Sequence, residues 1–76
     1  MILRLSSIPR GCWGKVVEID TDGALKRRLG DFGLVPETRV RWNYRSPGGD
    51  VMALELRSTV LAMRTRDAER IQVHIP

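Results

Sequence analysis

Apolar and polar residues alternate along several short stretches of the chain, a pattern typical of β-strands that bury one face. The segments between these stretches are rich in Gly, Ser, Pro and Asp, the residues typical of turns. We therefore expect a mainly β protein with five strands, at Lys15–Ile19, Thr38–Arg45, Val51–Arg57, Val60–Met63 and Ile71–Ile75.

The stretch Thr38–Arg45 alternates without interruption, so it should bury one face and expose the other. The apolar face carries Val40, Trp42 and Tyr44. The polar face carries Arg39, Arg41, Asn43 and Arg45. A turn at Ser46–Asp50 would lead into the return strand, whose inner face carries Met52, Leu54 and Leu56. By contrast, Val60–Met63 is apolar throughout, which is typical of a strand covered on both faces.

One segment follows a helical period instead. Leu25, Leu29 and Phe32 fall at positions i, i+4 and i+7, so they share one face of a helix. Thr21 or Asp22 would cap its first turn. We expect this apolar stripe to lie in the core. If the helix instead lies at the rim of the sheet, the same stripe would seat an apolar segment of a partner.

The end of this helix carries a strong stop signal. With Gly33 as the residue after the helix cap, Leu34 and Leu29 become the pair that meets in a Schellman motif. Glycine adopts the required left-handed conformation without a Cβ penalty. Pro36 prevents the helix from resuming and directs the chain into the next strand.

A second, single helical turn is expected at Arg66–Glu69, capped by Thr65 and followed by the last strand. Five short strands with one inserted helix are packed most economically as a small barrel that covers its own edges. The chain has 76 residues, so we expect one domain spanning residues 1–76.

The net charge is +4, and 11 of the 13 basic residues are arginine. This excess favours acidic partners, such as nucleic acid, anionic lipid or an acidic protein surface, unless it serves solubility alone. No apolar run approaches the length that spans a bilayer, so membrane insertion is not expected. The one cysteine, Cys12, has no partner for an internal disulfide and fits a reducing cytoplasm.

The order of these motifs resembles the FeoA family of ferrous iron transport accessory proteins over essentially the whole chain. The most specific parts are the helix end Arg28-Leu29 with Phe32–Pro36, and the later run Leu61–Arg64. The glycine before the first strand, the hairpin Ser46–Asp50 and the closing segment Ala68–Val73 also match. The chain departs from the family at Glu37 and Ser58, where the family commonly has glycine, and both positions lie in turns.

The resemblance implies an SH3-like barrel in the cytoplasm, a binding module and not a catalyst. Its implied partner is a FeoB-type transporter, a membrane protein with a cytoplasmic G domain that moves ferrous iron in a GTP-dependent manner. No cofactor is expected, and a monomer is favoured. Similar domains form the C-terminal modules of metal-dependent repressors. Because no DNA-binding helix precedes the domain in this sequence, we expect a free-standing protein.

Candidate catalytic and metal-binding residues are few. His74 should face solvent at the end of the last strand, and Cys12 lacks a second cysteine at ligand spacing. The carboxylates of Asp20 and Asp22 are interpreted as turn and helix-cap residues. Neither a catalytic nor a specific metal site is therefore predicted.

The candidate partner-binding residues are basic or lie on the helix: Arg27, Arg28, Leu29, Arg39, Arg41 and Arg45. Arginine side chains in a row suit pairing with carboxylates or phosphates. A small nucleic-acid-binding barrel is the alternative interpretation. Single-strand binding usually combines arginine with aromatic residues on one surface, whereas here Trp42 and Tyr44 are expected on the opposite face from the arginines. The protein-binding interpretation is therefore preferred.

Overall fold

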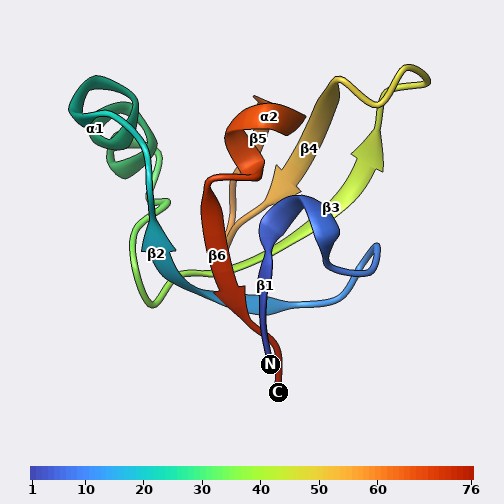
Figure 1. Cartoon of the computed structure of the whole chain (residues 1–76), viewed down its shortest axis with the longest axis horizontal. Coiled ribbons are helices and arrows are strands. Elements are labelled where there is room, and N and C mark those ends of the chain that lie inside the picture. Colours follow the sequence, from blue (N-terminus) through green and yellow to red (C-terminus); the bar gives the residue numbers. More distant parts are fainter.

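The computed structural model describes residues 1–76 and consists of one antiparallel sheet with three short helical segments (Figure 1). The six strands follow the order β1-β6-β2-β3-β4-β5 across the sheet. They are β1 (Ile2–Arg4), β2 (Gly14–Ile19), β3 (Arg39–Arg45), β4 (Val51–Glu55), β5 (Val60–Arg64) and β6 (Ile71–His74). The helical segments are η1 (Leu5–Ser7, a 3-10 turn), α1 (Gly23–Asp31) and α2 (Thr65–Ala68). None of the helices has the length and apolarity needed to cross a membrane.

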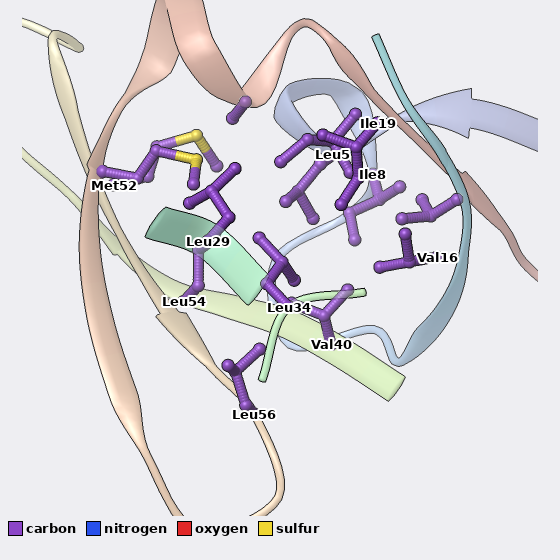
Figure 2. Close-up of a cluster of buried hydrophobic side chains, with 14 residues drawn as sticks. Leu5, Ile8, Val16, Ile19, Leu29, Leu34, Val40, Met52, Leu54 and Leu56 are labelled. Carbon is purple, nitrogen blue, oxygen red and sulfur yellow. The ribbon is translucent and has the colours of Figure 1, made fainter. Parts of the chain in front are cut away.

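Strand β3 belongs to both halves of the sheet. Its first residues, Arg39 and Val40, pair with β2, while Arg41–Arg45 pairs with β4. The sheet bends along this strand, and a cluster of buried apolar side chains fills the space inside the bend (Figure 2). The inner residues expected on the return strand, Met52, Leu54 and Leu56, all lie in this cluster.

The mainly β class with one inserted helix is confirmed, but two details of the expected barrel differ. The sheet does not close, because its edge strands β1 and β5 do not pair with each other. Instead η1 and α2 pack together, and Leu5 and Ala68 are fully buried there. Strand β1 was not expected, since three residues are too few to show an alternating pattern.

The predicted end of α1 is confirmed in detail. Gly33 has φ of +90°, its N–H donates to the carbonyl of Gly30 at 2.9 Å, and the N–H of Leu34 donates to the carbonyl of Leu29 at 2.9 Å. These are the two hydrogen bonds of a Schellman motif. Leu29 and Leu34 both lie in the core (Figure 2). At the other end, Asp22 is the cap, and its Oδ1 accepts from the N–H of Leu25 at 2.9 Å.

The expectation that the whole apolar stripe of α1 lies in the core is wrong for Phe32. Leu29 is the one buried residue of the helix, Leu25 is half-buried, and Phe32 is 50% exposed. The reason is that this face of the helix is only partly covered: Leu25, Leu29 and Phe32 line one groove beside β5, and Leu29 alone is buried.

Two expectations for strand faces also fail. A β-bulge between Trp42 and Tyr44 shifts the alternation of β3, so that Tyr44 is 52% exposed and Arg45 faces the fully buried Met52. Such an extra residue turns the remainder of a strand over. The apolar strand β5 is not covered on both sides: it is an edge strand, and Val60 is 72% exposed.

Thr65 has a different role from the cap that was expected. It is the first residue of α2, and no side chain caps that turn. Its hydroxyl donates to the carbonyl of Gly49, which ties α2 to the β3–β4 turn.

Residues Val35–Thr38 form the turn between α1 and β3. The N–H of Thr38 donates to the carbonyl of Val35 at 3.0 Å, Pro36 occupies the second position, and Glu37 has φ of +80°. This is the arrangement of a type II turn, which favours glycine at its third position. Glu37 is the only residue other than glycine with a positive φ in the chain.

We predict that Glu37→Gly raises the free energy of unfolding by about 1 kcal/mol, because it relieves the left-handed conformation of an L-residue. The ion pair lost with it, Lys15 to Glu37 at 3.5 Å, is exposed and contributes little. Urea unfolding measures the change. Glu37→Ala is the control, since it removes the same carboxylate but keeps the Cβ. A gain of equal size in both variants would contradict the turn assignment.

Candidate functional site

The outer face of the sheet carries a row of side chains from β3, β4 and the residue just before β2. Gly14 pairs with Val40 and Lys15 with Arg39, so the same register places Trp13 opposite Arg41. Arg41 in turn pairs with Glu55 on β4. Directly opposite residues of antiparallel strands lie side by side on one face. Trp13, Arg41 and Glu55 are therefore neighbours although they are far apart in the chain.

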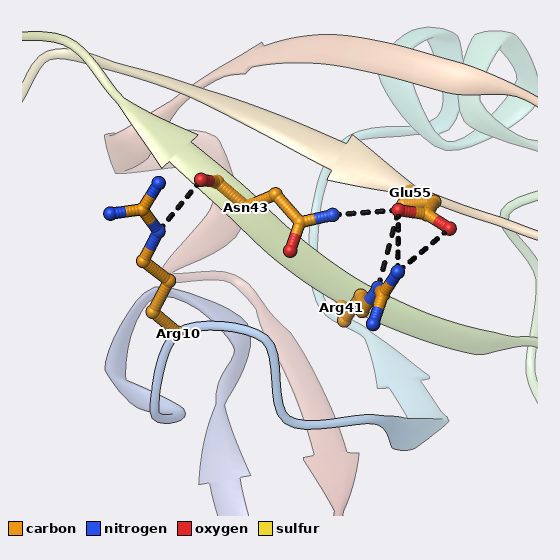
Figure 3. Close-up of polar contacts among 4 residues, drawn as sticks. All are labelled: Arg10, Arg41, Asn43 and Glu55. Atoms are coloured by element: carbon orange, nitrogen blue, oxygen red, sulfur yellow. Dashed lines mark hydrogen bonds and ion pairs between the residues drawn. The ribbon is translucent and has the colours of Figure 1, made fainter.

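Arg41 is held in place by the carboxylate of Glu55 (Figure 3). Its Nη2 donates to both oxygens of Glu55, at 3.0 and 3.2 Å, and its Nε donates to Oε1 at 3.2 Å. Asn43 Nδ2 donates to the same Oε1 at 2.6 Å, and Arg10 Nε donates to the carbonyl of Asn43 at 2.8 Å. The bulge residue Asn43 thus connects the loop before β2 with the Arg41–Glu55 pair.

Trp13, Arg39 and Arg41 form what we call the basic ridge. The guanidinium carbon of Arg39 lies 5.2 Å from the centre of the Trp13 ring, and that of Arg41 lies 4.7 Å from it. Both distances allow a cation–π interaction. Arg39 is exposed and has no carboxylate partner, whereas Arg41 is half-buried and paired. Arg39 is therefore the residue of the ridge whose charge is available to another molecule.

Arg45 does not join the basic ridge, because the bulge turns it to the inner side of the sheet. Its Nη2 donates to the carbonyl of Ser6 at 2.6 Å, and its guanidinium lies 4.6 Å from the centre of the Trp42 ring. The Nε of Arg45 is enclosed without a hydrogen-bond partner. Trp42 Nε1 donates to the carbonyl of Ile8 at 2.7 Å. These contacts fix the segment after β1 to β3, which is a structural role.

The three candidates on α1 are also separated from the ridge. Arg27 is exposed, and Leu29 is buried in the core. Arg28 lies at a groove between α1 and β5, which we call the edge groove. Its lining consists of Leu25, Arg28, Leu29 and Phe32 from α1, Leu61, Ala62, Met63 and Arg64 from β5, and Asp67 from α2.

Sequence reasoning missed two residues of this surface, Trp13 and Glu55. It also missed that β5 has a free edge. Alternation alone places residues on faces but does not give the register between strands that are distant in the chain. The register of β2 against β3 puts Trp13 on the same face as Arg39 and Arg41. The expected separation of Trp42 and Tyr44 from the arginines is wrong, because Tyr44 lies on the exposed outer side and Arg45 lies against the Trp42 ring on the inner side. Trp13, which that expectation did not include, also lies beside Arg39 and Arg41.

The polar residues considered for chemistry are dispersed. His74 is exposed, as expected, and Cys12 is a half-buried free thiol. No three His, Cys, Asp or Glu side chains are grouped so that they could hold a metal ion.

Comparison with protein families gives a match to the FeoA domain over residues 3–75. The match spans nearly the whole chain, so this protein belongs to the FeoA family. The comparison with curated proteins gave no match.

Solved structures agree with this assignment. The FeoA protein of Chlorobium tepidum is 33% identical with a TM-score of 0.91, over 96% of this chain and 70% of that one. The FeoA-like protein of Clostridium acetobutylicum is 28% identical with a TM-score of 0.83, over 97% of this chain and 86% of that one.

The fold also occurs within larger regulators. A manganese-dependent transcriptional repressor is 21% identical with a TM-score of 0.87 over 99% of this chain, which covers 42% of the repressor. At this identity the likeness concerns the fold alone. It agrees with the SH3-like class expected from the sequence.

The different placement of Arg45 and Arg39 predicts different effects on stability. Arg45→Ala should lower the free energy of unfolding by about 2 kcal/mol, because it removes a charged hydrogen bond to Ser6 and leaves that carbonyl without its donor. Arg39→Ala should change it by less than about 0.5 kcal/mol, since the side chain is exposed. Urea unfolding followed by tryptophan fluorescence measures both. Equal losses would contradict the assignment of Arg45 to the interior.

Proposed function

We propose that the protein is a cytoplasmic accessory protein of ferrous iron uptake that binds the cytoplasmic region of a FeoB-type transporter. It acts as a binding module and not as a catalyst. Family membership supports the link to iron uptake, and iron(II) transport protein A from Clostridium thermocellum has a similar fold. In this proposal the reaction chemistry, GTP hydrolysis included, belongs to the partner.

The observation that carries the proposal is the preorganised basic ridge. Arg41 is fixed by Glu55, and the Trp13 ring contacts both arginines, so little side-chain freedom remains to be lost on binding. Arg39 retains an uncompensated charge at the exposed end of this arrangement. An acidic patch on the partner would pair with Arg39, and charge complementarity of this kind sets orientation and specificity.

One observation favours the nucleic-acid alternative, namely that Trp13 shares a face with Arg39 and Arg41. Two others weigh against it. Glu55 neutralises the charge of Arg41. Lys15, which pairs with Arg39 across β2 and β3, forms an ion pair with Glu37, with 3.5 Å between Nζ and Oε2. A groove that follows a phosphate backbone needs several free cations. The protein partner therefore remains the proposal.

We predict that Arg39→Glu reduces recovery of the solubilised transporter on the immobilised protein roughly fivefold or more, because a rim charge of the wrong sign repels the acidic partner. Arg57→Glu is the matched control: Arg57 is also exposed and lies in the β4–β5 turn, outside the ridge. Arg41→Glu is avoided, since it would place two carboxylates opposite each other.

Two outcomes would count against the proposal in different ways. Unchanged recovery with Arg39→Glu would overturn the role of the basic ridge. Failure of the unmodified protein to recover the transporter would overturn the partner itself.

A further inference from the structure

Strand β5 has one side without hydrogen-bond partners. Its five residues pair with β4 in an unbroken register, from Glu55 opposite Val60 to Val51 opposite Arg64. Beyond the two ends of this ladder, the N–H of Leu56 donates to the carbonyl of Thr59, and the N–H of Thr65 donates to the carbonyl of Asp50, both at 2.8 Å.

These two bonds define which backbone groups of β5 are free. Hydrogen-bonded pairs alternate with non-hydrogen-bonded pairs in an antiparallel ladder. Leu61 and Met63 therefore bond to β4, while the N–H and C=O groups of Val60, Ala62 and Arg64 point to the free edge. No other segment bonds to the backbone of Ala62.

The free edge of β5 lacks the features that usually prevent pairing with another chain. Protected edges are short, bulged, covered, or interrupted by charged residues or proline. The other edge, β1, is short, with three residues. Strand β5 is longer, has no bulge, and carries no charge from Val60 to Met63. An exposed apolar edge of this kind is a template for strand addition.

Helix α1 borders this edge without covering it. The two elements line the edge groove, which has a volume of about 230 Å³. Its most buried residues are Leu29 and Met63, which also belong to the core. The exposed Phe32 and the half-buried Leu25 and Leu61 form its apolar walls. The groove therefore offers space for a large apolar side chain beside free backbone groups.

The charges at the groove are not balanced. Arg28 and Arg64 line it together with a single carboxylate, Asp67, and neither arginine forms an ion pair within the chain. An occupant that carries an acidic side chain would complement this excess.

We propose that the free edge of β5 binds an extended segment of a partner protein as an additional strand. The segment's backbone bonds to Ala62, one large apolar side chain fills the edge groove, and an acidic residue pairs with Arg28 or Arg64. A helix or a small molecule would leave the row of backbone groups unsatisfied. The identity of the partner as the transporter rests on the proposed function, whereas the site itself does not.

A synthetic peptide tests the site without the transporter. The probe is a short peptide in which valine alternates with glutamate around a central leucine, titrated into isotope-labelled protein and followed by NMR. We expect shifts confined to β5 and α1, and slower exchange of the Ala62 amide with solvent. A peptide with lysine in place of glutamate should bind about tenfold more weakly. Absence of binding, or shifts centred elsewhere, would overturn the proposal.

Two pairs of variants separate the backbone and charge contributions. Ala62→Pro removes an edge-facing N–H without breaking the ladder to β4, so it should weaken binding about tenfold or more, whereas Ala62→Ser should not. Arg28→Glu should weaken binding similarly, while Arg27→Glu on the exposed side of α1 should not. Equal effects within either pair would contradict the proposed geometry, and the second pair remains informative if Ala62→Pro does not fold.

The alternative occupant is a second copy of this chain. Sedimentation of the unmodified protein and of Ala62→Pro decides between them. A dimer that dissociates in the variant would overturn the partner-segment proposal. A monomer in both, together with peptide binding, supports it. Because the peptide assay does not contain the transporter, loss of the transporter interaction alone would count against the proposed function and not against this site.

Discussion

Helix α1 is fixed to the rest of the molecule at its C-terminal end, and the arrangement of the exposed surfaces depends on this attachment. Leu29 is its one buried residue, and the Schellman motif at Gly33 brings Leu34 into the same core. The type II turn at Pro36 and Glu37 then directs the chain into β3. Burial of these two leucines fixes the C-terminal end of the helix. The rest of α1 is not packed against β5.

Two surfaces of different chemistry result. On the outer face, the register of β2, β3 and β4 aligns Trp13, Arg41 and Glu55. The strand pairing that builds the sheet therefore also positions the side chains of the basic ridge. At the edge, α1 and β5 enclose an apolar groove next to unpaired backbone groups. The first surface suits charged recognition, and the second suits strand addition.

Local chemistry was the part that the sequence could predict. The helix cap, the left-handed Gly33 and the Leu29–Leu34 pair depend on residues close in the chain. The structure confirms them, with Asp22 as the cap out of the two candidates Thr21 and Asp22. Long-range pairing was not predictable in the same way. The bulge in β3 reverses Tyr44 and Arg45 because of how β3 pairs with β4. The apolar run of β5 indicated a strand, yet its position at an edge follows from the strand order.

Amide hydrogen exchange of the unliganded protein reports on whether the edge of β5 beside α1 is free. The amides of Leu61 and Met63, which bond to β4, should exchange slowly. The amide of Ala62, between them, should exchange much faster, since it faces the open edge. Protection of Ala62 equal to that of its two neighbours would mean that the edge is already covered, and would contradict the account.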